Sequence, residues 1–373
     1  MPNSHLFKPL NIRKTTIRNR IWVSPMCQYS VDEHDGVPHD WHLVNLGQTA
    51  AGGAGLVFTE ATAVSPEGRI TSEDTGIWND EQARAWARVV KFLHSQGASA
   101  GIQLSHAGRK GSDYKLFTDK CGTTKPVSEG GWETVAPSPL AYPGFDIPKE
   151  LDWEGIDAVV DDFAAAAQRS RESGFDVVEI HAAHGYLIHQ FLSPLSNERT
   201  DDYGGSLENR SRLLLRIIAA VREAIGEEMA LFVRFSATDW TEGGWDEHQN
   251  ATVAAWCREA GADFFDISSG GIINGIFISV EPGYQVPLAE HVGRHGEVDV
   301  AAVGLITTPA QAEEIVASGR AEAVMLGREM IRDPHFALRA AHELGEEIDY
   351  WTRQYRGAVY QTAVLAESSR GGE

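Results

Sequence analysis

Cysteine is scarce in this 373-residue chain, which contains only Cys27, Cys121 and Cys257. A sparse, odd-numbered set argues against a disulfide framework and is typical of a reducing compartment. Apolar runs are also short. The first 20 residues lack the apolar core of a signal peptide, and no run approaches the ~18 apolar residues of a membrane-spanning helix. We therefore expect a cytoplasmic protein that has no membrane partner.

Basic residues are few compared with acidic ones, because 32 Lys and Arg stand against 53 Asp and Glu, a formal net charge of −21. Such a surface repels phosphate backbones, so we expect no nucleic-acid partner. No low-complexity linker divides the chain, and α/β barrels often reach this length as one domain. We predict a single domain over residues 1–373.

Eight short apolar runs recur along the chain, and amphipathic segments with helical spacing lie between them. The runs are rich in Val, Ile, Leu or Phe without strict alternation, which is typical of strands buried on both faces. They are Ile21–Met26, Gly55–Val64, Ala100–His106, Asp176–Ala183, Ala230–Ala237, Ala262–Ser269, Asp299–Ile306 and Ala321–Arg328. This alternation predicts a (β/α)8 TIM barrel. An open doubly wound sheet is the rival, but no Gly-x-Gly-x-x-Gly motif follows the first run.

In a barrel of this kind the chemistry lies at the C-terminal ends of the strands. The long connections 27–40, 107–150 and 270–298 are expected on that face as excursion loops. The 107–150 segment contains Gly-Trp-Glu and Pro-Ser-Pro sequences. We predict that it forms a lid or cap over the site instead of part of the core.

The fourth run ends in a cluster of chemically useful side chains, His181, His184 and Tyr186. Two imidazoles can donate two hydrogen bonds to one oxygen, and a phenol can supply a proton. Two solvated turn histidines are the unremarkable alternative. A metal-dependent TIM-barrel hydrolase with His181 and His184 as ligands also stays open, although no other strand end completes an obvious ligand set. A non-enzymatic ligand-binding barrel is a weaker possibility.

Three other strand ends carry polar residues in apolar surroundings. Cys27 follows the first run, where a thiol either faces the mouth or packs as a small buried group. Gln103 needs a buried hydrogen-bonding partner. Arg234 needs an anion, and an ion pair with Glu60 or Glu179 would satisfy it without any ligand.

The last two runs end in Gly304 and in Gly327-Arg328. Glycine lets backbone N–H groups approach a ligand closely, and the loops after strands seven and eight are the usual phosphate site of a TIM barrel. Together with the buried glutamine and arginine, these residues predict a phosphorylated heteroaromatic cofactor.

Several of these residues belong to longer motifs. The stretch His181–Arg210, read as HAAHGYLIHQFLSPLSNERTDDYGGSLENR, resembles the signature of the old yellow enzyme family. The segments Ser24–Tyr29, Gln103–Lys110 and Leu326–Arg328 fit the same family in order and spacing. Cys27, where yeast-type enzymes carry Thr, is similar to the thermophilic-like branch of bacterial ene-reductases, xenobiotic reductases and NADPH dehydrogenases.

The resemblance implies a barrel that binds FMN non-covalently and is reduced by NADPH or NADH. Hydride from flavin N5 would then pass to the β-carbon of an α,β-unsaturated carbonyl or nitro compound. His181 and His184 would hold the oxygen of this activated alkene, and Tyr186 would protonate its α-carbon. Cys27 would lie near the flavin and tune its potential, as a modulator and not as a nucleophile.

The resemblance also implies the remaining contacts, and no metal is expected among them. Tyr29 and Lys110 would border the substrate pocket. The isoalloxazine would meet one set of residues and the ribityl phosphate another. The implied cofactor-binding residues are Ser24, Pro25, Met26, Cys27, Ala61, Gln103 and Arg234, followed by Ser269, Gly270, Gly304, Gly327 and Arg328.

The C-terminal stretch Tyr350–Gly357 combines aromatic and arginine side chains, a composition enriched at interface hot spots. A tail packed on its own barrel is the alternative. In the thermophilic-like branch a Gln-Tyr-x-Arg or similar tail enters the neighbouring active site. Gln354-Tyr355-Arg356 resembles that tail with one spacer residue fewer. We predict that residues 346–373 lie at the interface of a homodimer or homotetramer, with Arg356 in the partner's substrate pocket.

Overall fold

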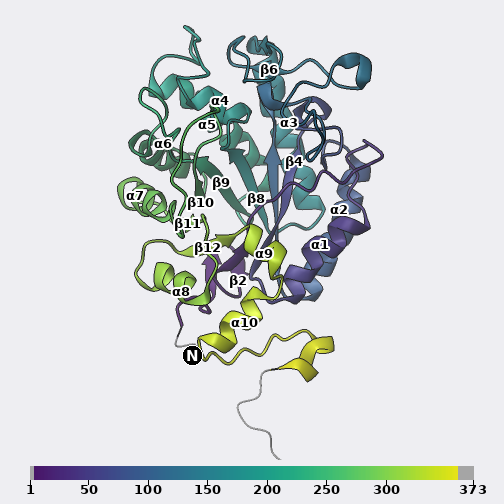
Figure 1. The fold of residues 1–373 in the computed structure, drawn as a ribbon, viewed down its shortest axis with the longest axis vertical. Helices are drawn as coiled ribbons and strands as arrows, with labels where there is room; N and C mark the ends of the chain where they lie inside the picture. The colour runs from purple at the N-terminus through teal and green to yellow at the C-terminus, as the bar shows by residue number, and fades with distance from the viewer. Residues whose placement is uncertain (1–3, 360–373) are drawn as a thin grey trace, which may run out of the picture.

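Eight parallel strands close into a barrel in the computed structural model, which describes residues 4–359 (Figure 1). Each strand overlaps one of the eight apolar runs, so the predicted TIM barrel is confirmed. Because β12 pairs with β3, the ring is closed and the open sheet is excluded. The barrel strands are β3 (Ile21–Val23), β4 (Leu56–Ala63), β5 (Ser99–Ser105), β8 (Val177–Ala182), β9 (Ala230–Ser236), β10 (Phe264–Ser268), β11 (Val300–Ala302) and β12 (Ala323–Leu326).

Helices cover the outside of the barrel (Figure 1). The longer ones are α1 (Asp40–Ala51), α2 (Asp80–Ser95), α3 (Trp153–Glu172), α5 (Leu207–Ile225), α6 (Glu247–Glu259), α7 (Val286–Gly296), α8 (Pro309–Ala317) and α10 (Phe336–Glu343). Two short helices, α4 (Leu187–Leu192) and α9 (Arg328–Arg332), follow the ends of β8 and β12. Both therefore begin on the face where the site is expected.

Helix α3 illustrates how local sequence specifies these elements. Asp152 caps its first turn by accepting a hydrogen bond from the Gly155 N–H at 2.8 Å. Ile156 and Phe163 recur on one helical face and are fully buried against the barrel. Each such side chain stabilises the fold by about 1.5–3 kcal/mol relative to exposure. Gly174, with φ +88°, provides the left-handed residue just past the helix end.

A short antiparallel hairpin, β1 (Leu10–Ile12) with β2 (Thr15–Ile17), closes the N-terminal end of the barrel. Ile17 is fully buried in one cluster with the aromatic residues of the barrel interior. There the rings of Phe232 and Phe264 stack with centroids 4.8 Å apart. Packed side chains therefore fill the barrel interior at this end, and a ligand can enter only from the opposite end.

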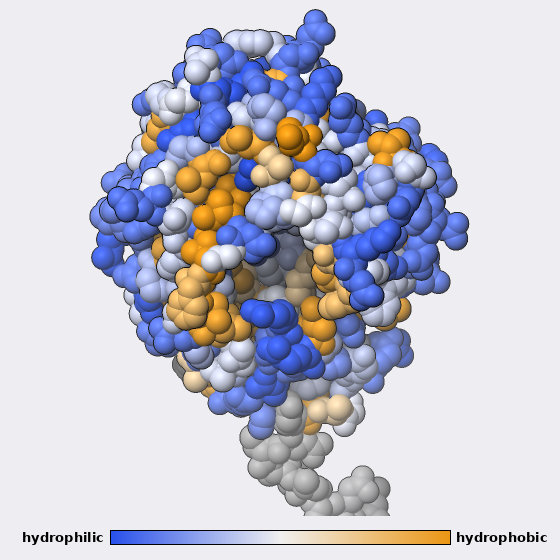
Figure 2. All heavy atoms as spheres, turned by 45° about the horizontal axis from the view of Figure 1, so that its top comes forward, coloured by the Kyte–Doolittle hydropathy of each residue, from blue (hydrophilic) through white to orange (hydrophobic). Residues whose placement is uncertain are grey.

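The connection over residues 107–150 lies beyond the C-terminal ends of the strands, near the β6 label in Figure 1. It contains the 3-10 turns η2 (Gly108–Lys110) and η3 (Val127–Glu129) and the two-residue strands β6 (Val135–Ala136) and β7 (Lys149–Glu150), which pair in parallel. Its action as a lid stays a prediction. Figure 2 shows the same end of the molecule hollowed at its centre, with apolar patches around the hollow.

The C-terminal segment runs beside α10, at the end of the molecule away from β6 (Figure 1). Tyr350 docks on its own barrel, because its Oη accepts a hydrogen bond from Asn19 Nδ2 at 3.1 Å. Arg356 lies in the exposed turn η4 (Arg353–Ala358). The rest of the predicted interface tail, residues 360–373, falls outside the described residues. Within residues 4–359, none of the helices combines the length and apolarity needed to cross a bilayer.

Candidate active site

Strand pairing brings the predicted residues to similar heights around the barrel. Ala61 on β4 is opposite Gln103 on β5, and Gln103 is opposite Glu179 on β8. His181 on β8 is in turn opposite Arg234 on β9. Residues far apart in the chain therefore share one end of the barrel because parallel strands have their carboxyl ends on the same side.

His181 and His184 lie together although strict strand alternation would separate them. Strand β8 ends at Ala182, and His184 adopts a left-handed conformation with φ +56°. The two imidazole centroids are 5.2 Å apart, and the ring of Tyr186 lies 5.1 Å from His181. The turn thus gathers two imidazoles and one phenol in one place.

Both imidazoles are uncharged at neutral pH. Burial, followed by the nearby Arg234 guanidinium, holds the pKa of His181 and of His184 well below the usual value. The Nδ1 of His181 accepts a hydrogen bond from the Ala183 N–H at 3.3 Å, which leaves its Nε2 as the donor. His184 Nε2 lies 2.8 Å from Ser268 Oγ. The neutral His181 ring can therefore donate to a ligand oxygen through Nε2, and His184 can do so through Nδ1 in the tautomer whose Nε2 accepts from the Ser268 hydroxyl.

The turn that carries His184 is held by backbone contacts. Its N–H donates to Ser236 Oγ at 2.9 Å. The Lys110 ammonium donates to the carbonyl oxygens of His184 at 2.8 Å and of Gly271 at 3.1 Å. A Cβ on Gly271 would lie 2.6 Å from the backbone of His184. Glycine at 271 therefore lets two loops touch directly, and Lys110 bridges them.

Tyr186 packs with Cys27, Tyr29 and Ala61 in a small apolar cluster at the mouth. Burial raises the pKa of the Tyr186 phenol well above its usual value, and Cys27 adds to the shift. The Nζ of Lys110 lies 5.0 Å from the centroid of the Tyr186 ring. The phenol therefore keeps its proton over the whole physiological pH range.

Cys27 is a thiol and not a thiolate. Burial raises its pKa, and the carboxyl groups of Asp74 and Glu60 raise it further. Glu60 fixes the next residue, because its Oε2 accepts a hydrogen bond from the Gln28 N–H at 2.9 Å. The other oxygen of Glu60 is 3.3 Å from His42 Nε2. The strand thus positions the cysteine through its neighbour.

The buried polar residues have partners that the sequence did not identify. Arg234 forms an ion pair with Asp266 on β10, at 2.9 Å from Nε to Oδ2. An acidic residue of a neighbouring strand does pair with Arg234, but it is neither of the two examples considered from the sequence, Glu60 and Glu179, because the pairing of β9 with β10 brings Asp266 next to Arg234. Gln103 Nε2 donates to Glu179 Oε1 at 2.7 Å, so a protein group already satisfies one end of that amide.

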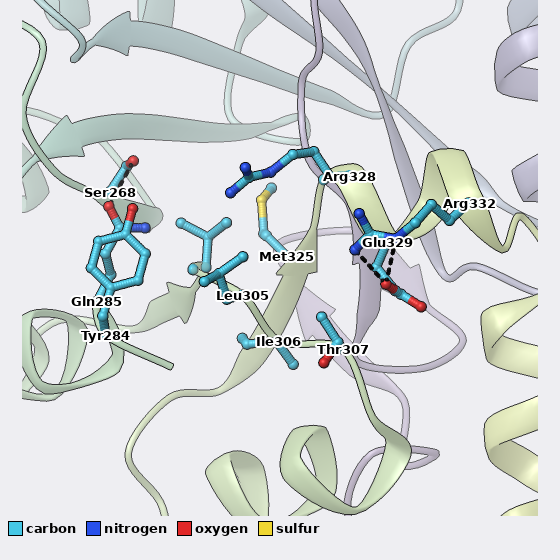
Figure 3. A pocket seen from close by; sticks show the side chains of 13 residues that line it. Ser268, Tyr284, Gln285, Leu305, Ile306, Thr307, Met325, Arg328, Glu329 and Arg332 are labelled. Atoms are coloured by element: carbon cyan, nitrogen blue, oxygen red, sulfur yellow. Dashed lines mark hydrogen bonds and ion pairs between the residues drawn. The ribbon is translucent and has the colours of Figure 1, made fainter. Parts of the chain in front are cut away.

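A cavity of about 190 Å³ lies beside the ends of β11 and β12 (Figure 3). Gly304, Gly327 and Arg328 line it, whereas Ser269 and Gly270 are not among its lining residues. Ser269 Oγ instead donates to Gln285 Oε1 at 2.5 Å. The lining residues missed by sequence reasoning are Ser268, Tyr284, Gln285, Val303, Leu305, Ile306, Thr307, Met325, Glu329 and Arg332.

Only a weak signal could have found those residues. The Ser268-Ser269 pair at the end of β10 leaves a one-residue ambiguity, which the structure resolves in favour of Ser268 as the lining residue. Gln285 stands just before α7, after a long connection whose path the sequence does not reveal.

The cavity fits a phosphate-bearing cofactor. Figure 3 shows Arg328 extending over the cavity, while Arg332 is tied to Glu329 in an ion pair of 2.7 Å. Across residues 4–359 the Arg328 guanidinium forms no ion pair or hydrogen bond. An uncommitted arginine beside glycine backbone after the last two strands matches the phosphate end of such a ligand. Fold and site thus define a TIM-barrel protein for a phosphorylated cofactor.

Comparison with known proteins gives the family. Residues 5–347 match the NADH:flavin oxidoreductase / NADH oxidase family, to which the chain belongs. It is 47% identical over 347 residues to an NADPH dehydrogenase of Listeria monocytogenes serotype 4b, covering 93% of this chain and 97% of that protein. It is 44% identical over 353 residues to an NADPH dehydrogenase of Bacillus subtilis, covering 94% and 98%.

The structure is similar to that of the old yellow enzyme homologue from Zymomonas mobilis. The TM-score is 0.74 at 28% sequence identity, over 96% of this chain and 99% of the other. The resemblance to the old yellow enzyme family is therefore confirmed. The protein is an oxidoreductase whose cofactor is FMN and whose reductant is NADPH or NADH.

Family membership does not favour the hydrolase alternative. Between Ser4 and Val359, no three His, Cys, Asp or Glu side chains gather closely enough to hold a metal ion together. His181 and His184 instead adjoin Tyr186, in a barrel whose family uses a flavin.

Proposed function

We propose that this oxidoreductase is an ene-reductase that acts on α,β-unsaturated carbonyl or nitro compounds. The observation that carries the proposal is the convergence of two neutral imidazoles and one protonated phenol at the mouth of the barrel. The chemistry that bound FMN supplies is hydride transfer from N5 to the β-carbon of the alkene. The protein residues bind, orient and protonate the substrate.

His181 and His184 hold the carbonyl or nitro oxygen of the substrate. Their N–H groups are uncharged donors fixed by burial, so they strengthen their hydrogen bonds as negative charge develops on that oxygen. Fixed donors in a dry site are most effective because they need no reorganisation during the reaction. The pair therefore polarises the alkene toward hydride acceptance.

Tyr186 gives its proton to the α-carbon. A phenol with a raised pKa retains its proton until a strongly basic carbon forms next to it. Cys27 adjoins the same cluster as a neutral thiol and modulates the cofactor. No step in this reaction needs a covalent bond to sulfur.

The remaining expectations complete the proposal. Tyr29 and Lys110 border the substrate pocket, and the 107–150 segment covers it. A second subunit of a homodimer or homotetramer supplies Arg356, and the protein acts in the cytoplasm. The relatives' name supports NADPH as the reductant. The residues proposed to contact FMN are Ser24, Pro25, Met26, Cys27, Ala61, Gln103, Arg234, Ser269, Gly270, Gly304, Gly327 and Arg328.

A double variant tests the substrate-binding role. His181→Ala with His184→Ala should abolish saturable binding of an enone, followed as a perturbation of flavin absorbance. Reduction of the flavin by NADPH should be much less affected. Wild-type enone binding in the double variant would contradict the proposal. Heat-released FMN, which is expected at about one per chain, provides the loading control.

A further inference from the structure

Four polar side chains are buried in the barrel wall below the mouth: Gln103, Glu179, Arg234 and Asp266. Glu179 and Asp266 are completely inaccessible to solvent, and Gln103 and Arg234 are nearly so. The group contains two carboxyl groups and only one cation. If both carboxyl groups were ionised, this buried cluster would carry a net negative charge.

The contacts within the cluster leave part of it unsatisfied. Glu179 Oε1 accepts a hydrogen bond from Gln103, and Asp266 is paired with Arg234. In the described part of the chain, Glu179 Oε2 and both carboxyl oxygens of Asp266 have no hydrogen-bond partner, and Asp266 is held by its ion pair with Arg234 alone. An ionised carboxylate buried with an unsatisfied oxygen is costly, so protonation is a favourable way to relieve it.

The electrostatic surroundings point to Glu179 as the group that holds the proton. Burial raises its pKa to about 8, and Asp266 adds to the rise while Arg234 and Gln103 oppose it. Burial also raises the pKa of Asp266, but its direct pairing with Arg234 favours the charged form. On its own strand, Glu179 is followed two residues later by the neutral His181.

Strand β4, which pairs with β5 on the side away from β8, adds no free charge to this cluster. Its acidic residue, Glu60, is committed to His42 and to the Gln28 N–H. Glu179 therefore faces one amide, one ion-paired arginine and one carboxylate.

We propose that, at alkaline pH, Glu179 binds one proton from solvent when the bound FMN is reduced and releases it when the FMN is reoxidised. This inference rests on the proposed position of FMN against Gln103 and Arg234. Hydride transfer from NADPH adds two electrons and one proton to the cofactor and so adds one negative charge there, leaving NADP+. The proton taken up converts the Glu179 carboxylate to the acid, which offsets that charge.

Reduction of the flavin and protonation of Glu179 are thermodynamically linked. A new negative charge nearby raises the pKa of Glu179 further, so the reduced protein holds the proton up to a higher pH than the oxidised protein does. Below a pH of about 8 Glu179 is protonated in both states, and no extra uptake occurs. Above that value, and up to the pKa in the reduced protein, reduction carries one extra proton.

The test compares flavin midpoint potentials of the wild-type holoenzyme and of Glu179→Gln between about pH 6 and pH 10. Each proton coupled to a two-electron reduction changes the potential by about 30 mV per pH unit. The wild-type slope should exceed that of the variant by this amount in a window above about pH 8. Below the window the two potentials should coincide. Asp176→Asn, which removes a carboxyl group just before the same strand, should keep the wild-type slope.

Equal slopes for wild type and Glu179→Gln would overturn the inference. A second measurement needs no variant. Anaerobic reduction of the wild-type holoenzyme by NADPH in weak buffer at about pH 9 should consume up to one proton per FMN, and consumption of none would also overturn it. Both readouts are independent of enone turnover, so a failed ene-reductase assay with an intact proton uptake would reject the proposed function alone.

Discussion

Among single residues, Tyr186 is the proton donor of the proposed reaction. Tyr186→Phe keeps the ring in its apolar cluster but removes the proton, so reoxidation by alkenes should slow by about 10²–10⁴-fold. Quinones, which take their protons from water, should reoxidise the variant at close to the wild-type rate. Anaerobic stopped-flow absorbance measures both rates. Equal losses with both acceptors would show that Tyr186 is not the acid.

Cys27 has a different expected behaviour because it is a buried neutral thiol. Cys27→Ala should retain enone turnover and should lower the flavin potential, since it removes a weak S–H donor beside the more negative reduced state. Spectroelectrochemical titration of the holoenzyme measures the shift. Complete loss of turnover with FMN still bound would contradict the modulating role.

Lys110 should make the KM for an enone depend on pH. Burial, followed by Arg109, lowers the pKa of the Lys110 ammonium to about 8, so its charge is lost as the pH rises through that value. Its hydrogen bonds to the carbonyl oxygens of His184 and Gly271 then weaken, and KM for an enone should rise above about pH 8. The Lys110→Met variant should have a raised KM at all pH values, and that KM should not rise further as the pH passes about 8.

Lys125→Met is the matched control for the Lys110 prediction, because it removes another lysine of the 107–150 segment, whose ammonium donates a hydrogen bond to Ser72 Oγ at 2.7 Å. It should keep the wild-type profile of KM against pH. If the KM of Lys110→Met still rose as the pH passed about 8, another group would be responsible for the rise.

How far residues can be predicted from sequence depends on what surrounds them. His181, His184 and Tyr186 were identifiable because they follow an apolar strand and lie close in the chain. The partner of Arg234 was not, because Asp266 lies on another strand and only the pairing register brings the two together. Glu179 was considered as that partner, but it lies on β8, on the opposite side of β9 from Asp266. It accepts a hydrogen bond from Gln103 instead.

At the scale of elements, direct backbone contact between two loops shapes the site. Gly271→Ala would place a Cβ 2.6 Å from the His184 backbone and displace the turn that carries His184 and Tyr186. Enone binding should weaken at least about tenfold, which corresponds to about 1.4 kcal/mol. KM and flavin absorbance titrations measure the effect.

Gly275→Ala is the control for that prediction. Gly275 lies in the same loop with a positive φ of 77°, but a Cβ there would meet nothing within 4 Å. It carries similar backbone strain without the collision, so enone binding should stay near wild type. Equal effects of the two substitutions would show that strain, and not contact with the turn, matters.

Elements also differed in how well the sequence predicted them. The eight barrel strands were found because continuous apolar runs mark strands buried on both faces. The hairpin formed by β1 and β2 was missed, because its three-residue strands contain polar residues such as Asn11 and Thr16 and give no run. The fold of the 107–150 segment was equally hidden, since its strands are only two residues long.

At the scale of the whole molecule, the segment that carries Arg356 lies away from its own barrel mouth (Figure 1). If Arg356 acts in a partner's site, a hybrid dimer of an Arg356→Ala chain and a Tyr186→Phe chain contains one intact site and one doubly defective site. Its activity should be about half that of wild type. Activity equal to the mean of the two parent variants, in confirmed hybrids, would place Arg356 outside the partner's site.

The proposed reaction is the delivery of hydride from reduced FMN in this barrel to an activated alkene. The most direct measurement mixes anaerobic, NADPH-reduced holoenzyme with a cyclic enone in a stopped-flow spectrometer and identifies the product. We expect saturable return of the oxidised flavin absorbance, with one equivalent of the saturated ketone formed per FMN. Flavin that stays reduced with every enone tested, but is reoxidised by a quinone, would contradict the account.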